Sequence, residues 1–229
     1  MKIAAFALAG AALAALAIGN PADATVLSFE SPSVGAVGYT YSSTALYPSA
    51  PSYFSLATEN GVTYAGMAGI QANGSAWGFT NAPDGTQTAF IQSYSGVYPQ
   101  GGSVSFSSSL ITSLVSGQQY DLSFYVEGRS YMGGSPFSVD IGGATTSFGA
   151  PGTSGWTLEN LLFTASANPA TISFSVAPQN SSDISIGLDK VNISAVPEPA
   201  TWAMLLIGFA GVGFMVHRRK QTRPQFRFS

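Results

Sequence analysis

The chain has 229 residues, of which only 8% are charged, and its formal net charge at pH 7 is −3. It contains no cysteine, which excludes disulfides, thiol catalysis and zinc–thiolate sites. Between residues 25 and 196, nine acidic residues outnumber two basic ones, whereas nucleic-acid phosphates require a surface rich in Lys and Arg. We therefore expect no nucleic-acid partner.

The first 24 residues are typical of a secretory signal peptide. Met1-Lys2 supplies a short positive region, and Ile3 to Gly19 is almost entirely apolar. Asn20-Pro21 ends this run just before Ala22-Asp23-Ala24, a small-x-small cleavage site. The expected partners are the Sec translocon and signal peptidase. An uncleaved N-terminal membrane helix is the alternative.

Residues 25–196 form the predicted exported domain, which is long enough for one core. Its polar and apolar residues alternate with a period of two, which indicates strands that are buried on one face. We therefore predict an all-β fold, a single β-sandwich of the jelly-roll type, with Trp77 and Trp156 in its core. The clearest strands are expected at 103–107, 120–126, 136–141, 171–176 and 184–193, and shorter ones at 26–30, 62–65, 88–92 and 156–164.

The order of several short segments resembles that of galactose-binding-like jelly-roll domains, a fold that many carbohydrate-binding modules share. The segments are Leu27–Glu30, Ala89–Gln92, Gly117–Phe124, Trp156 with Phe163–Ala165, and Gly187–Val191. The resemblance extends over nearly the whole domain and implies a sandwich with a ligand-binding surface. Because one fold serves many functions, it does not specify the ligand.

The same resemblance implies a structural Ca²⁺ bound by Glu30 and Asp189 together with backbone carbonyls. The two acids stand at the ends of the first and last expected strands, which lie close together in such jelly rolls. Calcium prefers hard oxygen ligands, six to eight of them, so the two carboxylates would need several further oxygens. The alternative is that both are solvated acids, with Asp189 paired to Lys190.

Aromatic residues in loop-like segments are candidates for a glycan-binding platform. Tyr94 and Tyr98 lie in a Ser- and Gly-containing segment, and Arg129 and Tyr131 stand beside Gly133-Gly134. A sugar offers a C–H face to a tyrosine ring and hydroxyls to an arginine. The alternative is that these rings pack against the domain with only the hydroxyl exposed.

The exported domain lacks the residues of the common hydrolytic sites. The only histidine in the chain is His217, near the C-terminus, so a Ser-His pair or a histidine metal site is excluded from residues 25–196. A glycosidase would need two carboxylates in one cleft, and no spacing singles out such a pair. We predict a non-catalytic protein, with a hydrolase that uses paired carboxylates as the less favoured alternative.

The C-terminal 33 residues, 197–229, combine a proline-rich motif, an apolar helix and a basic tail. Residues 200–216 carry no charge and predict a transmembrane helix about 25 Å long, short for a hydrocarbon core of about 30 Å. Residues 217–229 form the predicted cytoplasmic tail, because basic clusters stay on the cytoplasmic side. The cluster consists of Arg218, Arg219 and Lys220, which would stop transfer, followed by Arg223 and Arg227.

Pro197-Glu198-Pro199, followed at fixed spacing by Trp202-Ala203, the short helix and the basic end, resembles the PEP-CTERM sorting signal in its PEPxxWA variant. The resemblance implies export across the inner membrane of a Gram-negative bacterium and processing by an exosortase-type membrane transpeptidase. It also implies a place at the cell surface or in the extracellular matrix, with a transient or retained inner-membrane anchor. An ordinary C-terminal membrane anchor has the same hydropathy.

These observations predict an exosortase-sorted β-sandwich protein associated with exopolysaccharide or biofilm matrix. The alternative is a structural matrix protein or adhesin whose contacts are with other proteins only.

Overall fold

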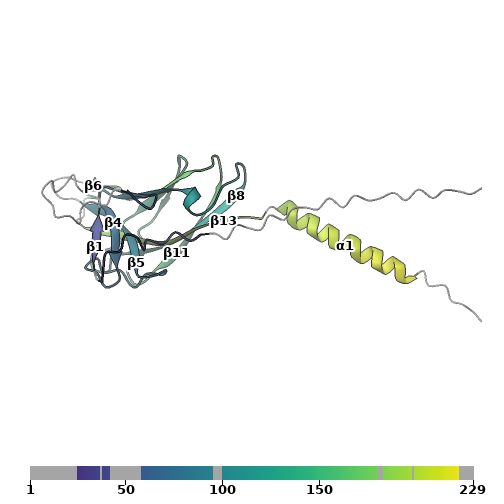
Figure 1. Cartoon of the computed structure of the whole chain (residues 1–229), viewed down its shortest axis with the longest axis horizontal. Helices are drawn as coiled ribbons and strands as arrows, with labels where there is room; N and C mark the ends of the chain where they lie inside the picture. The colour runs from purple at the N-terminus through teal and green to yellow at the C-terminus, as the bar shows by residue number, and fades with distance from the viewer. Residues whose placement is uncertain are drawn as a thin grey trace, which may run out of the picture.

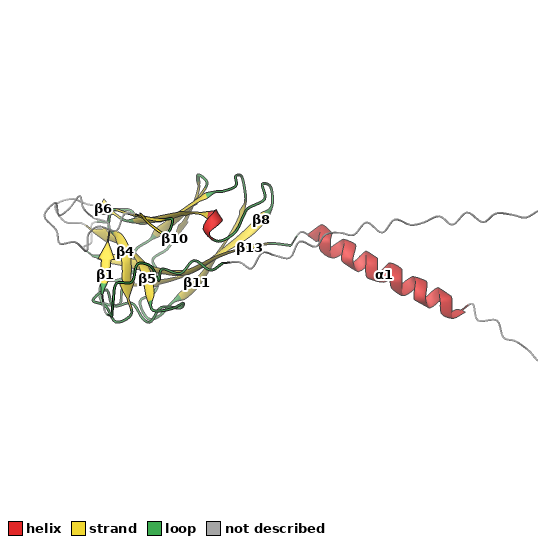
Figure 2. Ribbon diagram, viewed as in Figure 1, coloured by secondary structure: helices red, strands yellow, loops and turns green. Residues whose placement is uncertain are grey.

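The computed structural model of the chain describes residues 25–36, 38–41, 58–94, 100–179, 183–197 and 199–221. In this part of the chain two antiparallel sheets face each other, and the helix α1 (Pro199–Gln221) lies beyond one end of them (Figures 1 and 2). The predicted all-β sandwich is confirmed. The predicted signal peptide, residues 1–24, lies outside the described residues.

The first sheet, called the β13 sheet, has the strand order β1-β4-β5-β13-β8-β11, and β6 also pairs with β5. Its strands are β1 (Tyr39–Tyr41), β4 (Ala68–Ala72), β5 (Gln87–Tyr94), β6 (Gln100–Gly101), β8 (Gln119–Gly128), β11 (Thr157–Thr164) and β13 (Ile184–Ala195). A bulge between Asp189 and Asn192 interrupts the pairing of β13 with β8. Leu27 forms an antiparallel bridge with Val191, so the start of the domain lies beside its last strand.

The second sheet, called the β7 sheet, has the order β10-β9-β12-β7-β3-β2. Its strands are β2 (Thr58–Glu59), β3 (Val62–Ala65), β7 (Ser103–Ser107), β9 (Phe137–Ile141), β10 (Ala144–Phe148) and β12 (Thr171–Ser175). A short 3-10 helix, η2 (Ser108–Leu110), follows β7.

The main core fills the space between the sheets and is built by alternation along each strand. On β8 every second residue from Tyr120 to Val126 is buried, and on β7 Val104 and Phe106 are buried. Phe124 of β8 meets Phe174 of β12 edge-on, with ring centroids 4.9 Å apart. Such aromatic pairs add stability beyond the area that they bury. The two layers are therefore joined into one rigid support for the loops and outer faces.

All the strongly alternating segments form strands in the structure, within about two residues of their predicted ends. The shorter segments at 62–65, 88–92 and 156–164 also form strands, β3, β5 and β11. The prediction at 26–30 is wrong in type, because this segment makes only the isolated bridge at Leu27. Strands β1, β2, β4, β6 and β10 were not predicted.

Candidate functional site

A second, smaller hydrophobic cluster lies on the outer face of the β13 sheet. It consists of Trp77, Phe79 and Phe90, with Trp156 packed against them. Trp77 and Phe79 belong to the connection between β4 and β5, residues 73–86, which covers part of this face. Trp77 is buried in a hydrophobic cluster, as predicted, although outside the space between the sheets, and Trp156 is only partly buried against it. They pack against Phe90, which points away from the core because its neighbours in β5 point into it.

The buried carboxylate of Glu127, on β8, holds the 73–86 connection against the sheet. Its Oε2 accepts hydrogen bonds from the backbone N–H of Thr80 at 2.9 Å and from the Thr80 hydroxyl at 2.8 Å. The Thr80 carbonyl in turn accepts a hydrogen bond from the indole N–H of Trp156 at 3.4 Å. Gly187 of β13 lies directly below, where a Cβ would stand 2.7 Å from Trp156. Glu127, Thr80 and Gly187 thus fix the distance at which the 73–86 connection packs against the sheet.

Glu30 and Asp189 hold the other end of the same connection. Glu30 accepts hydrogen bonds from the N–H groups of Thr86 at 2.9 Å and Gln87 at 2.8 Å, and from the Thr86 hydroxyl at 3.0 Å. Asp189 accepts one from the N–H of Asp84 at 2.9 Å through Oδ2. Its Oδ1 is buried and has no hydrogen-bond partner within the described residues. The structure thus places these two predicted metal ligands at one end of one loop.

The electrostatic environment of Asp189 favours its neutral form. Burial, together with smaller contributions from the nearby charges of Asp84 and Glu30, raises the pKa of its carboxyl to about 7. The hydrogen bond from the backbone N–H of Asp84 acts in the opposite direction. Among the described residues, no three Asp, Glu or His side chains gather to hold a metal ion. A cation at Asp189 would therefore depend on backbone oxygens, as the sequence predicts.

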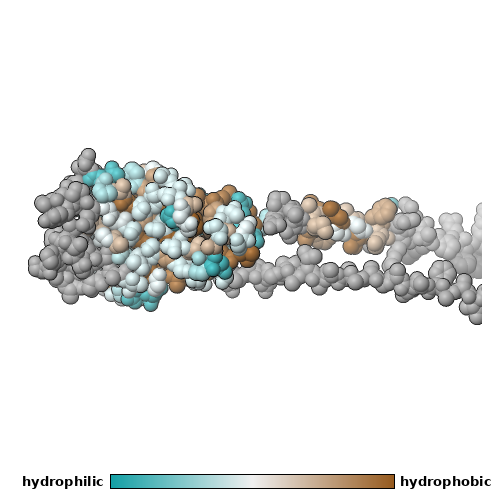
Figure 3. Space-filling model, turned by 90° about the horizontal axis from the view of Figure 1, so that it is seen from above, coloured by the Kyte–Doolittle hydropathy of each residue, from teal (hydrophilic) through white to brown (hydrophobic). Residues whose placement is uncertain are grey.

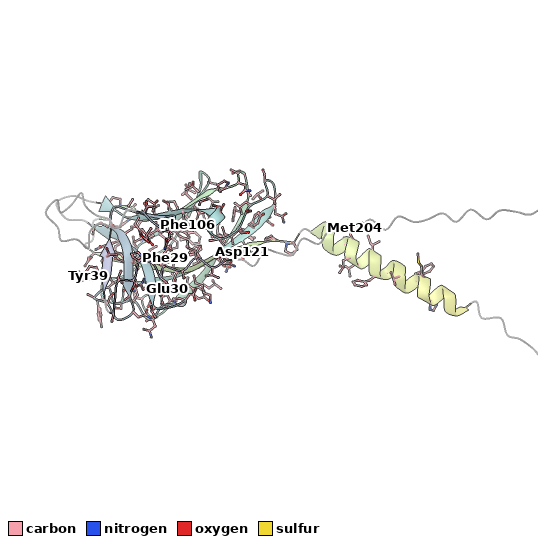
Figure 4. All side chains as sticks on the ribbon, in the orientation of Figure 1. Phe29, Glu30, Tyr39, Phe106, Asp121 and Met204 are labelled. Carbon is pink, nitrogen blue, oxygen red and sulfur yellow. The ribbon has the colours of Figure 1, made fainter. Side chains whose placement is uncertain are left out.

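A hollow of about 180 Å³ lies at the edge of the second cluster, where β1, β5 and the end of β8 approach one another. Polar and aromatic side chains line it together. The lining residues are Tyr39, Ala76, Trp77, Gln92, Arg129 and Asp183. Figure 4 shows Tyr39 at the end of the sandwich farthest from α1, whereas Asp121 lies toward the opposite end.

Arg129 is the central side chain of this hollow. One guanidinium nitrogen forms an ion pair with Asp183 at 2.8 Å, and the other donates to the carbonyl of Ala76 at 3.3 Å. The guanidinium also lies over the Trp77 ring, 4.7 Å from its centroid, a favourable cation–π geometry. Gln92 donates to the other carboxylate oxygen of Asp183. Arg129 is therefore held rigidly, with its donors beside a fixed acceptor.

The rings around the hollow differ in what they can bind. Trp77 is stacked on Phe90 at 3.9 Å and lies under Arg129, and only 7% of it is exposed, so its indole does not offer a face to a ligand. Tyr39 meets Trp77 edge-on and is 39% exposed, and Tyr131 is 90% exposed. Tyr131, two residues after Arg129, is therefore the more open of the two tyrosine rings, and Trp77 supports Arg129.

Two of the four predicted platform residues lie in one turn, and of these Arg129 is among the residues that line the hollow. Tyr131 lies two residues along the turn, which Ser130 fixes by donating to the carbonyl of Gly78 at 2.6 Å. Tyr98 and the side chain of Tyr94 lie outside the described residues.

The sequence does not point to five of the six described residues that line the hollow: Tyr39, Ala76, Trp77, Gln92 and Asp183. Only one of them has a recognisable sequence pattern. Asp183 is an acidic residue that directly follows a turn-like Ser pair, and it has a positive φ of 74°, where Asp and Asn are favoured.

The predicted sorting segment lies at the end of the last strand. Pro197 is exposed, Glu198 lies outside the described residues, and Pro199 is the first residue of α1, a position that suits proline because its missing N–H would have no helical partner. The backbones of Trp202 and Ala203 follow in the helix, and those of Arg218, Arg219 and Lys220 belong to its last turns.

The helix is longer than predicted, because it ends at Gln221 rather than at residue 216. Figure 3 shows the described surface of α1 as largely hydrophobic and most of the visible sandwich surface as hydrophilic. No helix in the described part of the chain meets the length and apolarity that a membrane crossing requires, so the predicted span at 200–216 stays a prediction.

Comparison with known families settles the nature of this segment. Residues 195–220 match the model of the PEP-CTERM protein-sorting motif. The chain carries a PEP-CTERM sorting signal. The predicted sorting signal is thereby confirmed, and the motif implies export and processing by an exosortase. It covers 26 of the 229 residues and leaves the ligand of the sandwich open. None of the curated proteins matches the chain.

Several solved structures are similar to the sandwich. The CBM22-1 xylan-binding domain of Paenibacillus barcinonensis Xyn10C is 13% identical with a TM-score of 0.43, over 62% of this chain and 90% of that one. TmCBM61, solved in complex with β-1,4-galactotriose, is 13% identical with a TM-score of 0.42, over 60% and 90%. The exo-β-1,3-galactanase Pc1,3Gal43A of Phanerochaete chrysosporium is 16% identical with a TM-score of 0.40, over 58% of this chain and 27% of that one.

Proposed function

We propose that the exported sandwich is a non-catalytic, glycan-binding domain that associates with exopolysaccharide at the cell surface or in the biofilm matrix. The observation that carries this proposal is the hollow in which Arg129 and Asp183 stand side by side with the ring of Tyr39, while the exposed Tyr131 follows Arg129 by two residues. Paired polar groups that fix orientation, beside aromatic surface, are typical of sites for small polar ligands. The PEP-CTERM motif supports the location, because it directs proteins to export.

The burial of the acidic residues favours binding over hydrolysis. A glycosidase needs two carboxylates that face one substrate cleft. Glu127 and Asp189 are fully buried beneath the 73–86 connection, and Asp183 is the one carboxylate among the described residues that line the hollow. Hydrolysis of the bound glycan by the purified protein would contradict the proposal.

Tyr131→Ala tests the site directly. Because 90% of Tyr131 is exposed, the substitution leaves the packed core intact, and we expect about tenfold weaker binding if one stacking contact of about 1.4 kcal/mol is lost. Leu162→Ala, at a residue that is 61% exposed on β11, is the control and should bind as the wild type does. Isothermal titration with polysaccharide extracted from a biofilm gives the measurement. Equal affinities of the wild type and Tyr131→Ala would remove Tyr131 from the site.

We also propose a structural Ca²⁺ bound through Asp189 and Glu30. The buried, unpartnered Oδ1 of Asp189 supports it, and the three hydrogen bonds that Glu30 accepts leave a lone pair of its carboxylate available. When bound, the ion would supply positive charge that compensates the two buried or clustered carboxylates. Asp189 and Glu30 would then tie the last strand, the first segment and the 73–86 connection together.

Protein–protein contact in the matrix is a second candidate function. It is favoured by Leu158 and Leu162, which are 48% and 61% exposed on β11, the edge strand of the β13 sheet. Exposed apolar residues on an edge strand promote association. Light scattering without glycan distinguishes the two functions: self-association that Leu162→Ser abolishes would support this one, and a monomer at all concentrations would exclude it.

A further inference from the structure

We infer that the hollow beside Arg129 selects an uncharged sugar, which it binds through two neighbouring hydroxyl groups, and that it disfavours uronate-bearing polysaccharides. This inference rests on the proposed glycan-binding function and adds the chemical class of the ligand. It depends on three features of the described residues, namely the state of the arginine charge, the arrangement of donors and acceptors, and the size of the hollow.

The positive charge of Arg129 is already neutralised within the site. Asp183 lies 2.8 Å from one guanidinium nitrogen, and the pair is only partly exposed, with 15% of the Arg129 side chain and 32% of the Asp183 side chain accessible. The Trp77 ring lies against the same guanidinium. A ligand carboxylate entering the hollow would therefore meet a carboxylate as well as a cation, and like charges at close range are repulsive.

The surroundings add no second cation. Lys190 is the other basic residue of the exported domain, and its ammonium lies 5.9 Å from the centroid of the Tyr125 ring. The carbonyl of Ser185 on β13 accepts a hydrogen bond from the N–H of Arg129. Lys190 follows Ser185 by five residues, a distance of about 16 Å along an extended strand. With nine acidic residues against two basic ones, the domain as a whole repels polyanions.

The ion pair presents a donor and an acceptor side by side. A guanidinium has donors only and a carboxylate accepts only, whereas a sugar hydroxyl can do both. Of two neighbouring hydroxyls, one can accept from Arg129 while the other donates to Asp183. Gln92 fixes the far oxygen of Asp183, so the carboxylate keeps its orientation without the ligand. A preorganised pair of this kind reduces the entropic cost of binding.

The volume of the hollow suits one sugar ring. Its 180 Å³ is many times the space of about 10–15 Å³ that one ordered water needs by the same measure, which leaves room for a sugar ring. Tyr39 lines the hollow itself, whereas the exposed Tyr131, two residues after Arg129, is not among its lining residues and can contact the next unit of a chain. The site thus recognises one uncharged sugar residue and accommodates the sugar residues on either side of it.

The variant Asp183→Asn tests this selectivity, because it should reverse the preference between neutral and uronate-bearing oligosaccharides. Asn keeps the shape, and it suits the positive φ of 74° at this position, but it leaves the Arg129 charge unbalanced. We expect neutral oligosaccharides to bind about tenfold more weakly and oligouronates about tenfold more tightly than they bind the wild type, a shift of about 1.4 kcal/mol in each direction.

The control is Asp140→Asn, which changes the net charge equally but lies on β9 of the other sheet, where Asp140 accepts hydrogen bonds from Gly143 and Thr145. The probes are gluco-, galacto-, manno- and xylo-oligosaccharides, their di-O-methylated forms, oligogalacturonate and oligomannuronate. They are titrated into the full chain in detergent micelles, and thermal unfolding is measured for each variant to verify that it is folded.

The outcomes separate this inference from the proposed function. Three results together support the inference. The wild type binds a neutral oligosaccharide, O-methylation of that oligosaccharide abolishes the binding, and Asp183→Asn, but not Asp140→Asn, reverses the preference between neutral and uronate-bearing ligands. Tighter wild-type binding of oligouronates overturns the inference and leaves the glycan-binding function standing. Absence of binding to every probe and to extracted biofilm polysaccharide overturns both.

Discussion

The two outer faces of the sandwich differ sharply, although they cover the same core. On the β7 sheet the outward residues are small and hydroxylated, with Asp140 as their carboxylate on β9; they include Thr63, Ser103, Ser105, Ser107, Ser138, Thr171, Ser173 and Ser175. On the β13 sheet the outward residues include Phe90, Gln92, Glu127 and Asp189, all of them buried. Within the described residues, every buried side-chain nitrogen or oxygen that lacks a hydrogen-bond partner belongs to a residue on the outer face of the β13 sheet.

The connections between strands account for this difference. On the β7 sheet, β9 and β10 are joined by Gly142-Gly143, both at positive φ, which is the shortest kind of hairpin turn. On the β13 sheet, the 73–86 connection folds back over the strands and needs polar groups to bind its backbone N–H groups. The two faces thus share one scaffold, and the 73–86 connection supplies Ala76 and Trp77 to the lining of the hollow.

The largest expected effect concerns the pH dependence introduced by Asp189. Because the native state raises the pKa of this carboxyl from 3.8 to about 7, it retains a proton that the unfolded state releases. The free energy of unfolding should therefore fall as pH rises from about 4 to about 7, by up to about 4 kcal/mol, and then level off. Urea unfolding in chelator at several pH values measures the fall, which Asp189→Asn should remove.

Added Ca²⁺ sharpens this test. An ion bound to the Asp189 carboxylate favours its charged form, so the fall between pH 4 and 7 should become smaller and stability at pH 7 should rise with Ca²⁺ concentration. The same curve with and without Ca²⁺ would contradict the proposed calcium site. The curve of Asp140→Asn should remain parallel to that of the wild type.

The next effect compares two carboxylates, one on each outer face. Glu127→Ala should lower the free energy of unfolding by about 3 kcal/mol, because the N–H and hydroxyl of Thr80 lose a buried, charged acceptor. Asp140→Ala, on the exposed face of the β7 sheet, should cost less than about 1 kcal/mol. Denaturant unfolding measures both, and equal losses would show that the 73–86 connection is not held in this way.

The smallest stability effect tests how closely the connection approaches the sheet. Gly187→Ala should cost about 2 kcal/mol, because the new Cβ would stand 2.7 Å from Trp156 and 3.2 Å from Phe79. Ser173→Ala, at a half-buried position on the outer face of β12, should change the free energy of unfolding by less than about 0.5 kcal/mol. The fluorescence of Trp156 should also shift in Gly187→Ala, and an unchanged spectrum together with unchanged stability would contradict the packing described.

The sequence predicts the two layers well, because apolar and polar residues alternate wherever one face of a strand is buried and the other is exposed to solvent. It fails at β4 (Ala68–Ala72), where every residue is buried, since Gln71 is covered on the outer face and bonds to Thr88 and Ser75. It also fails at β10 (Ala144–Phe148), which is almost uniformly exposed. In both strands the period of two is absent because the two faces have similar surroundings.

The candidate site is less accessible to sequence reasoning, because its residues come together only through the fold. Gln92 and Asp183 are 91 residues apart along the chain and touch only because β5 pairs with β13. The sequence singles out Arg129 and Tyr131 as candidates because the glycine-rich turn next to them predicts a loop. The burial of Trp77 is predictable from the sequence, but the sequence does not distinguish an apolar cluster on the outer face of a sheet from the core between the sheets.

The most direct test of the glycan site is to map a bound neutral polysaccharide onto the protein by nuclear magnetic resonance. The amide and side-chain signals of Tyr39, Gln92, Arg129 and Tyr131 should shift on titration, while those of Ser105 and Ser173 on the β7 sheet stay in place. Shifts confined to the β7 sheet, or none with any glycan of the cell's own matrix, would contradict the account.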